Sequence, residues 1–406
     1  MLVACDYFLP SQRAGGPAKS VRSILDALGA TSRFLIVTRD RDRGDAGAYP
    51  GVAAARWCRA FGALVYYAPP GVVRWCTLAA LARRVAPDVI YLNSLFSPQF
   101  SSWLLVMARL HWLPGQPRIV VAPRGELAPS ALAIKPARKQ LFLAFARLCG
   151  LYRGVAWHAT GVGEAADIRT ALAASLGLDP RSTRVLIAPP PLLAQRQPNR
   201  APTKQVGRLR LVFMSRISRV KNLHVALAAV RLLRGEVEFD IYGAIARPED
   251  ATYWRECQAL LNDLPPGIRV NYRGSVPRDE VLAVLAGYHA FVLPSAGENY
   301  GHAIVEALLA GCIPCISDRT PWRGLAAVGV GWDVDVDSAE PLAVALQSCI
   351  ELDASSFADH GAAIRRYLDQ QFDAAAVRSA NAALFAEPSL PDTGRPESSG
   401  EMRPEA

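Results

Sequence analysis

Several features that would assign a function directly are missing from this 406-residue sequence. Its apolar stretches are interrupted by Arg109 and Arg147 before they reach the roughly 18 residues that a membrane-spanning helix needs. The first residues, MLVACDYFLP, show no basic leader and no cleavage site, which indicates a first β-strand rather than a signal peptide. No recognition helix, zinc finger or aromatic RNA-binding motif accompanies the basic residues, so we expect no nucleic-acid partner.

The cysteines give no sign of a disulfide framework. They are scattered among apolar residues without the tight framework of a small secreted domain, so we expect reduced thiols and a cytoplasmic protein. Cys312 and Cys315 form a C-x-x-C pair, which can indicate zinc or redox chemistry. A zinc site of this kind needs a second ligand pair at suitable spacing, and none follows. We therefore interpret both residues as buried structural cysteines.

The charges are divided unevenly along the chain. Residues 1–200 carry 25 Lys and Arg against 10 Asp and Glu, a balance of +15, whereas residues 201–406 carry 20 against 26, a balance of −6. The electropositive half favours an anionic membrane surface or a phosphorylated acceptor as a partner. An arginine-rich surface that is merely solvated explains the same charge equally well.

Short apolar runs alternate with longer helical patterns, as is typical of α/β proteins with parallel sheets. We predict two facing Rossmann-like, doubly wound domains, residues 1–195 and 208–386, joined by a polar linker at 196–207. The last helix is expected to pack back toward the N-terminal domain, and residues 387–406 to form a disordered tail. Loops at the carboxyl ends of both sheets would then face an interdomain cleft, where such sheets bind ligands.

Two stretches predict phosphate binding. Gly15 and Gly16 stand between the first strand and the first helix, where glycines let a phosphate approach backbone amides. Arg216 and Lys221 follow the strand LRLVFMS on the loop that opens the next helix. Cations oppose the dipole at a helix start, so two of them there favour a bound diphosphate. The glycine pair alone is not the G-x-G-x-x-G fingerprint and also fits an ordinary flexible loop.

The segment GENYGHAIVE places two carboxylates, Glu298 and Glu306, around a glycine and a histidine. Glu298 lies in the loop after the strand HAFVLPS and therefore at the lip of the predicted cleft. Glu306 lies in the second turn of a helix that begins near Gly301 and ends at Gly311. The same spacing also fits a loop acid and a helix-surface acid that share no function.

Together these motifs resemble glycosyltransferase family 4 over nearly the whole chain. The glycine pair, R-x₄-K at 216–221 and E-x₇-E at 298–306 carry the resemblance, with the segments DVIYLNSLFS, APRGEL, HATGVGEAADI, DIYG, YRGSVPRDEV and LPSAGENYGHAIVEALLAGC. The resemblance implies a GT-B fold of two facing Rossmann-like domains. It also implies a transferase that uses a nucleotide-sugar donor and retains the anomeric configuration.

The resemblance assigns the phosphate site to residues of both domains. It implies that the amides of Gly15 and Gly16 contact the donor phosphates and that Arg216 and Lys221 neutralise the leaving nucleoside diphosphate. Breaking the glycosidic bond leaves negative charge on the diphosphate and positive charge on the sugar, so fixed cations and a nearby carboxylate lower the barrier. We therefore expect no metal and no other cofactor, and no D-x-D-like pair placed at a strand end for a divalent ion.

The remaining donor contacts are implied in the C-terminal domain. Glu306 would bind the ribose hydroxyls, and Glu298 would lie beside the donor sugar. Backbone groups would complete the site, at the base through Ser275 and Val276 and at the sugar and phosphate through Asn299, Tyr300 and Gly301.

One position departs from the family pattern. Many members place a histidine beside the donor sugar after the fifth strand, where this chain reads VVAPRGEL with Arg124. Arginine cannot act as a base near neutrality, so we interpret Arg124 and Glu126 as groups that position the donor sugar or an anionic acceptor. His158 and His302 are further candidates, although packing or capping explains such histidines more often.

The acceptor is expected at the basic N-terminal domain, which meets the acceptor in the family. Lys135 and Lys139 belong to a basic stretch that precedes an apolar helix face, a combination suited to a peripheral helix on anionic lipid. The face consists of Leu141, Phe142, Phe145 and Leu148. A helix of the protein core fits the same pattern.

We predict a retaining, metal-independent hexosyltransferase that moves a sugar from a nucleoside-diphosphate donor to a saccharide acceptor. The acceptor would be lipid-linked or part of a cell-envelope glycan, and the protein would act in the cytoplasm at the inner face of the membrane. A nucleotide-sugar epimerase of the same fold is one alternative, and it would convert the donor without an acceptor. A non-catalytic binding subunit is the other, and the intact set of expected site residues argues against it.

Overall fold

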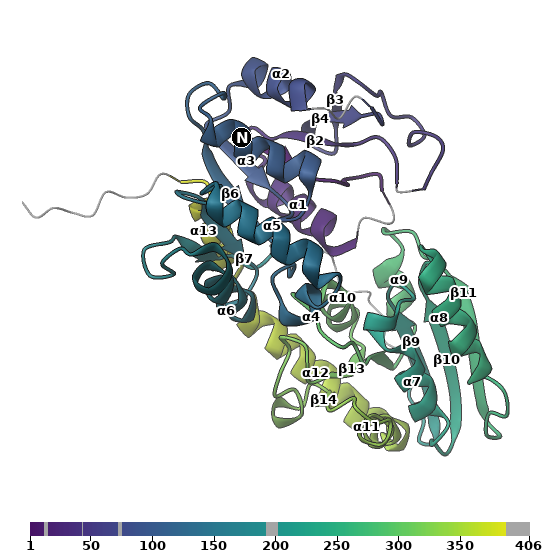
Figure 1. Cartoon of the computed structure of the whole chain (residues 1–406). Helices are drawn as coiled ribbons and strands as arrows, with labels where there is room; N and C mark the ends of the chain where they lie inside the picture. Colours follow the sequence, from purple (N-terminus) through teal and green to yellow (C-terminus); the bar gives the residue numbers. More distant parts are fainter. Residues whose placement is uncertain (12–14, 43, 72–74, 192–201, 387–406) are drawn as a thin grey trace, which may run out of the picture.

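The computed structural model describes residues 1–11, 15–42, 44–71, 75–191 and 202–386. These residues form two α/β units, each built on a mostly parallel sheet with helices packed on its faces (Figure 1). The expected linker 196–207 is described only from residue 202, and the predicted tail 387–406 lies outside the described residues. Within the described residues, no helix is both long and apolar enough to cross a bilayer.

The first unit contains an 8-stranded sheet in the order β3-β4-β2-β1-β5-β6-β7-β8. Its strands are β1 (Leu2–Ala4), β2 (Leu35–Arg39), β3 (Trp57–Ala60), β4 (Ala63–Ala68), β5 (Val89–Leu92), β6 (Arg118–Val121), β7 (Ala156–Ala159) and β8 (Val185–Ile187). Its helices are α1 (Gly15–Leu28), α2 (Trp75–Val85), α3 (Trp103–Arg109), α4 (Pro129–Leu132), α5 (Pro136–Leu148) and α6 (Val162–Ala171), with the short turns η1 (Pro98–Ser102) and η2 (Leu172–Leu176).

The second unit contains a 6-stranded parallel sheet in the order β11-β10-β9-β12-β13-β14. Its strands are β9 (Arg208–Met214), β10 (Glu236–Tyr242), β11 (Ile268–Gly274), β12 (Ala290–Leu293), β13 (Ile313–Ser317) and β14 (Trp332–Val334). Its helical elements are η3 (Arg219–Lys221), α7 (Leu223–Val230), α8 (Pro248–Ala259), α9 (Val281–Leu285), α10 (His302–Leu309), η4 (Ala326–Val328), α11 (Glu340–Glu351), α12 (Ala354–Gln371) and α13 (Ala374–Ala383).

The central strands are apolar because both of their faces are buried. On β1, Leu2 and Ala4 join the core on one face of the first sheet, and Val3 joins the core on the other face. Side chains of a strand alternate between its two faces, so a short apolar run supplies both cores at once. This explains why the sequence shows continuous apolar runs at these strands.

The edge strand β3 was not expected from the sequence. It pairs antiparallel with β4, and Ala60 lies opposite Ala63, so that only Phe61 and Gly62 form the turn. Both turn residues have positive φ, 52° and 83°, which is the geometry of a tight type I′ hairpin. Such turns favour Asn-Gly or Asp-Gly, and a Phe-Gly turn gives little signal in the sequence.

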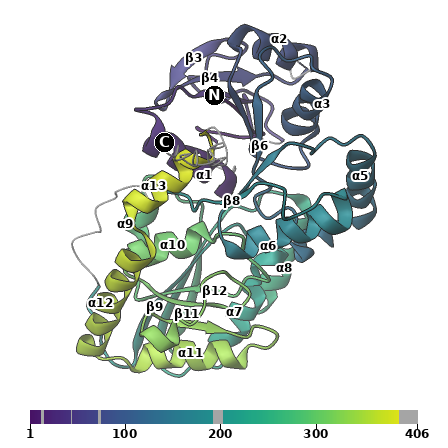
Figure 2. The same ribbon diagram turned by 90° about the vertical axis from the view of Figure 1, so that its left-hand side faces the viewer.

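The end of the described chain returns to the first unit. Figure 2 shows α12 running along the second unit and α13 continuing to the first. The Asn381 amide donates to the carbonyl of Pro189 at 2.8 Å. The ring of Phe385 lies 6.5 Å from that of Phe34 and 5.6 Å from that of Tyr91. The two units are therefore joined by a packed helix as well as by the connecting segment.

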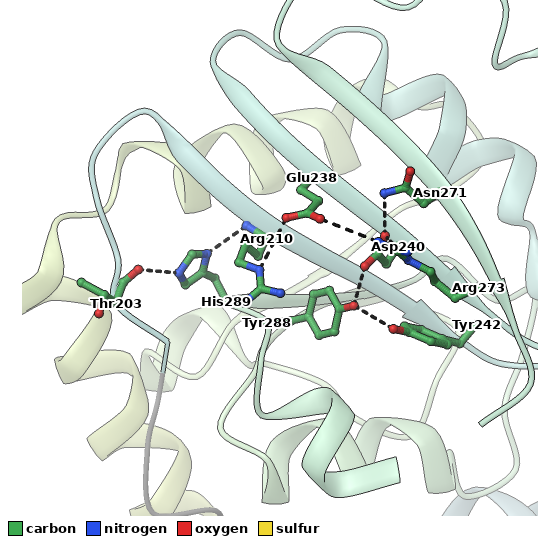
Figure 3. A network of polar contacts seen from close by, with 9 residues as sticks. All are labelled: Thr203, Arg210, Glu238, Asp240, Tyr242, Asn271, Arg273, Tyr288 and His289. Carbon is green, nitrogen blue, oxygen red and sulfur yellow. Dashed lines mark hydrogen bonds and ion pairs between the residues drawn. The ribbon is translucent and has the colours of Figure 1, made fainter. Parts of the chain in front are cut away.

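A polar network crosses the second sheet toward its carboxyl edge (Figure 3). At its centre the buried Asp240 accepts a hydrogen bond from the Tyr288 hydroxyl at 2.6 Å. Tyr242, the last residue of β10, brings its hydroxyl to 3.1 Å from that of Tyr288. At the other end, the ring of His289 lies between the carbonyl of Thr203 and the backbone amide of Arg210 in β9, and it bonds to both. Asp240 also accepts from Asn271 and Arg273. The network thus ties Thr203, in the described part of the linker, to the strand edge that carries the cleft.

Candidate functional site

A cleft of about 1180 Å³ lies between the two units, at the carboxyl edges of both sheets. Parallel α/β sheets bind their ligands at this edge, because the strand-to-helix loops gather there. Most of the site residues that the sequence predicts line this one cleft. They are Gly15, Gly16, Arg124, Glu126, Arg216, Lys221, Ser275, Val276, Glu298 and Glu306.

Lys221 and Glu298 form an ion pair in the cleft. Lys221 ends η3, and Glu298 lies in the loop between β12 and α10, so neighbouring strands β9 and β12 bring them together. Their side chains are only 14% and 12% exposed, so solvent screens the pair weakly. Arg216 lines the same cleft and makes no ion pair within 4 Å with a described residue. Its guanidinium group remains open to a ligand anion.

A second ion pair crosses the cleft. Glu306 on α10 pairs with Lys19 on α1, and the two side chains are 22% and 24% exposed. Lys19 was not predicted as a site residue, although it stands three positions after Gly16. Glu306 therefore already has a cationic partner from the opposite unit.

His302, the first residue of α10, also meets the first unit. Its Nε2 lies 3.0 Å from the hydroxyl of Ser20, and a Cβ at Gly16 would lie 3.0 Å from its Cδ2. Glycine at position 16 thus permits the two helices to approach. Burial, reinforced by the charges of Lys19, Arg124 and Arg278, lowers the pKa of His302 to about 3. The imidazole is therefore neutral near pH 7.

Arg124 occupies a turn directly after β6, with a φ of 57°. Its Nε donates to Asn93 Oδ1 at 2.8 Å and its Nη2 to the hydroxyl of Tyr91. Its Nη1 is buried without a hydrogen-bond partner among the described residues. The next residue, Gly125, has a φ of 80°, and a Cβ there would lie 2.8 Å from Cβ of Asn299. The turn is held against the loop that carries Glu298.

Glu126 closes a loop of the first unit. Its carboxylate accepts hydrogen bonds from the hydroxyl of Ser94 and from the amides of Leu95 and Phe96. Burial raises the pKa of Glu126, although these hydrogen bonds oppose the rise. The contacts show that Glu126 orders the loop after β5 at the wall of the cleft.

Three predicted donor residues lie behind the cleft wall rather than on it. Asn299 points into the first unit, where its amide donates to Thr160 and to the buried Glu164, 3.0 Å from each. The carbonyl of Tyr300 accepts from Trp322, and Gly301 precedes α10 with a φ of 78°. The side chains of Asn299 and Tyr300 therefore pack within the protein and do not line the cleft.

Other candidates lie away from the cleft. Lys139 donates to the carbonyl of Ala131, and Lys135 is exposed at the start of α5. His158 is buried between the hydroxyl of Tyr91 and the carbonyl of Ala188, at 2.7 Å from each. Burial lowers its pKa to about 3, so it serves as a neutral structural group.

The expectation about D-x-D pairs was wrong, because Asp40 and Asp42 directly follow β2 at the cleft. Both carboxylates have protein partners. Arg41 holds both oxygens of Asp40, and Asp42 accepts from the hydroxyls of Ser11 and Tyr49. Across the described residues, no three His, Cys, Asp or Glu side chains gather as a metal site would require. Cys312 and Cys315 are buried and free, as the sequence analysis expected.

Several residues that line the cleft were not predicted from the sequence. Lys19 and Arg278 stand close in sequence to predicted residues, Gly16 and Val276, so their proximity was an available signal. The charged loop after β2, with the pattern RDRDRGD, alternates cations and acids and was another such signal. Its described side chains line the same cleft.

Comparisons with known proteins locate the chain among solved folds. The chain resembles Alr3699/HepE from Anabaena, solved in complex with UDP-glucose, with a TM-score of 0.67 at 18% identity over 94% of this chain and 98% of that one. Sucrose-phosphate synthase from Thermosynechococcus elongatus gives 0.69 at 17% identity over 95% and 97%. WaaG, a glycosyltransferase involved in lipopolysaccharide biosynthesis, gives 0.64 at 13% identity over 96% and 100%.

A comparison with curated protein sequences gives no significant match. The family model described as "Glycosyl transferases group 1" matches residues 195–365, the segment that holds Arg216, Lys221, Glu298 and Glu306. The chain therefore has the fold of the GT-B glycosyltransferases, and its second unit carries the sequence pattern of glycosyl transferases group 1.

Proposed function

We propose that the protein is a retaining glycosyltransferase that moves a hexose-type sugar from a nucleoside-diphosphate donor to a saccharide acceptor. One observation carries the proposal. Residues from two units, which the family resemblance assigns to donor phosphate, ribose and sugar, line a single cleft. The family model covers the half of that cleft in which both acids and the cationic pair lie.

In this proposal Arg216 and Lys221 bind the diphosphate and stabilise the charge that develops on it as it leaves. Glu306 binds the ribose hydroxyls, and Glu298 lies beside the donor sugar. The backbone of Val276 reads the base, and the amides of Gly15 and Gly16 complete the donor site in the cleft. The protein cations supply the neutralisation, so the proposed reaction uses no metal.

The nucleotide is the first part of the proposal to test. Thermal unfolding is measured with UDP, GDP, ADP and dTDP, and one of them should raise the melting temperature more than the others. A ligand at 100 times its Kd stabilises the folded state by about 2.7 kcal/mol. UDP is the first choice, because Alr3699/HepE was solved with UDP-glucose. The free nucleosides serve as controls, and no shift with any diphosphate would contradict the proposal.

The reaction is then followed with the matching nucleotide-hexose, with and without a membrane extract. A transferase consumes the donor faster when the extract supplies an acceptor, whereas an epimerase converts it equally well without one. The anomeric configuration of the product, read by NMR, tests retention. An inverted product would contradict the proposed mechanism, and an epimer of the donor would favour the alternative function.

The outer face of the first unit supports a membrane-linked acceptor. Figure 2 shows α5 at the edge of this unit. On its outward face Leu141, Phe145 and Leu148 are 73%, 53% and 87% exposed, at helical spacing. Lys135 and Arg138 are exposed at the start of the same helix. Large apolar side chains beside cations are suited to the surface of an anionic bilayer. We propose that this face holds the protein at the cytoplasmic side of the membrane, near a lipid-linked or cell-envelope acceptor.

Co-sedimentation with lipid vesicles tests the membrane face. We expect binding to vesicles that contain phosphatidylglycerol and little binding to pure phosphatidylcholine, because both apolar insertion and charge contribute. Replacing Leu141 and Phe145 by serine should reduce the binding about tenfold or more. Val344→Ser, an exposed apolar position on α11, is the matched control. Equal binding by the control and by the α5 variant would show that α5 is not the contact.

A further inference from the structure

We propose that a second cavity, on the first unit, binds a phosphate monoester that carries a ring, such as a sugar phosphate. The cavity measures about 650 Å³, which is within the range of small-ligand pockets. It lies between the loop that joins α1 to β2 and the turn of the β3–β4 hairpin, and its lining residues are 29–34 and 59–64. The proposal goes beyond the proposed function, because none of these residues lines the cleft.

The cavity and the cleft lie at opposite edges of the first sheet. The cleft includes Arg39 and Ala68, which end β2 and β4. The cavity includes Phe34, which precedes β2, and Ala63, the first residue of β4. The five residues of β2 span about 17 Å, so a small ligand in the cavity does not extend into the cleft.

Two arginines are the charged groups among the described residues that line the cavity. Arg33 and Arg59 are both exposed. Neither guanidinium group has an ion-pair or hydrogen-bond partner in the described part of the chain. No described Asp or Glu lines the cavity to compete for them. Because a guanidinium group donates paired N–H bonds to phosphate oxygens, the two arginines are suited to one phosphate group.

The acids outside the cavity do not neutralise this pair. Asp26 is held by Arg22, whose Nη1 donates to the carbonyl of Phe61. Asp88 precedes β5, two strands away from β2, and therefore lies about 10 Å from Arg33 along the sheet, where salt screens an exposed charge. The other acids of residues 1–125 line the cleft at the opposite edge.

The end of α1 does not account for the two arginines. Cations near the end of a helix often bond its last carbonyls, where the dipole is negative. Here the carbonyl of Leu28 accepts from the amides of Thr31 and Ser32, at 3.0 and 2.9 Å. The carbonyl of Leu25 accepts from the amide of Gly29 at 2.7 Å. Backbone amides thus cap these carbonyls without a guanidinium group, and the helix end offsets only about half of one positive charge.

Phe61 gives the cavity an aromatic ring. It occupies the hairpin turn with a φ of 52°, where a bulky side chain is unusual and Asn or Asp is favoured. The ring is 39% exposed and packs in a T-shaped contact against the buried Phe8, with 6.1 Å between the ring centres. A ring that is held in place and still partly open can stack on a sugar or on a base. Ligand binding would explain why this turn carries an unfavourable residue.

An NMR titration tests the site with defined compounds. Glucose 6-phosphate and AMP are compared with inorganic phosphate and with glucose, and the tighter of the first two identifies a sugar or a nucleotide as the source of the ring. We expect at least one of them to bind threefold or more tighter than inorganic phosphate. Glucose should bind at least tenfold more weakly, because the phosphate supplies most of the affinity. Absence of binding by both phosphate esters, or equal binding by glucose, would overturn the proposal.

Substitution of the arginines locates the bound phosphate. Arg33→Gln and Arg59→Gln should each weaken binding about tenfold, the loss of one charge-assisted contact. Arg56→Gln, exposed directly before β3 and outside the cavity, is the matched control. If both arginine variants bind as this control does, the cavity is not the site. Binding that Arg216→Ala abolishes and Arg33→Gln leaves unchanged would place the phosphate in the cleft and also overturn the proposal.

Phe61→Asn separates ligand binding from a structural role. The substitution gives the hairpin the Asn-Gly pair that type I′ turns favour, which offsets the lost contact with Phe8. We expect the melting temperature to change little, and the affinity for the phosphate esters to fall to that for inorganic phosphate. A lower melting temperature with unchanged affinity for both esters would show that the ring serves the fold alone, and would overturn the assignment.

Discussion

Two ion pairs fix charged side chains at the end of the cleft where we propose that the donor binds. Lys221 pairs with Glu298 within the second unit, and Lys19 pairs with Glu306 between the units. Each pair is mostly shielded from solvent, so each carboxylate is held in one place beside a cation. Arg216 completes this end as a cation without an acidic partner among the described residues. The predicted effect of a substitution on ligand binding or turnover therefore depends on which member of an ion pair is removed and which one stays in the cleft without its partner.

Replacing Glu298 by glutamine should reduce turnover with little change in donor affinity. The change removes the negative charge beside the donor sugar, where positive charge develops in the transition state, and leaves Lys221 free for the diphosphate. We expect turnover to fall about 10²-fold or more, roughly 3 kcal/mol of transition-state stabilisation. Steady-state kinetics measures this, with Glu256→Gln on the surface of the same unit as the control. Full activity would exclude the role assigned to Glu298.

Replacing Arg216 by alanine should weaken binding of the nucleoside diphosphate. The guanidinium group lines the cleft, and one charge-assisted contact contributes about 1.5–3 kcal/mol, or roughly 10–100-fold in affinity. Calorimetric titration measures the loss. Arg219 stands three residues away and pairs with Glu256 at the surface, so Arg219→Ala should change the affinity less than about twofold. The same affinity in both variants would remove Arg216 from the phosphate site.

At the scale of elements, one short segment of the second unit makes several contacts with the first. Asn299, just before α10, reaches Glu164 on α6, and His302 and Glu306 on α10 reach α1. The segment that carries the proposed donor site is thus also a contact between the units. Occupancy of that site is expected to influence how the units pack, because ribose hydroxyls and Lys19 compete for Glu306.

Replacing Lys19 by methionine should tighten binding of the nucleoside diphosphate. The substitution keeps the length of the side chain and removes the cation that occupies Glu306, so the carboxylate is free to accept the ribose hydroxyls. We expect a gain of a few fold in calorimetric affinity, about 1 kcal/mol or less. Arg22→Met, one turn further along α1 where Arg22 pairs with Asp26, is the control. Weaker binding would show that Lys19 itself contacts the phosphates.

At the scale of the whole molecule, three histidines are neutral in the folded state, two of them buried and His302 at the cleft. Burial lowers the pKa of His158 and His302 to about 3 and that of His289 to about 4. In the unfolded chain each returns to about 6.5. Folding therefore excludes protons that the unfolded chain binds below pH 6.5. The stability that depends on the neutral rings is complete above pH 6.5 and is lost as the pH falls toward 4.

The free energy of unfolding should accordingly fall between pH 6.5 and 5. Each histidine contributes a slope of up to about 1.4 kcal/mol per pH unit, because unfolding then takes up one proton. Urea unfolding at pH 7.5, 6 and 5 measures the slope. Replacing His289, which lies outside the cleft, by glutamine should reduce the slope, whereas the same experiment on exposed His111→Asn should not. A free energy that stays constant over this range would contradict the assignment.

The sequence by itself determined the two-unit α/β organisation and the identity of four charged groups that line one cleft. Both follow from local information: apolar runs at strands, and the spacing of Arg216 with Lys221 and of Glu298 with Glu306 on strand-to-helix loops. Because parallel strands present these loops at one edge, the cleft could be predicted as well. The hairpin of β3 was missed because its Phe-Gly turn lacks the Asn or Asp that usually precedes the glycine.

Only the tertiary structure decided how these groups are paired. Lys19 and Glu306 are 287 residues apart in the chain, and no local pattern links them. Asp40 is neutralised by its neighbour Arg41, whereas Asn299 turns away from the cleft because Glu164 of the other unit holds it. Such contacts depend on the way in which distant segments pack, and packing is a property of the whole chain. The local sequence supplies the charged groups, and the fold determines which of them remain free for a ligand.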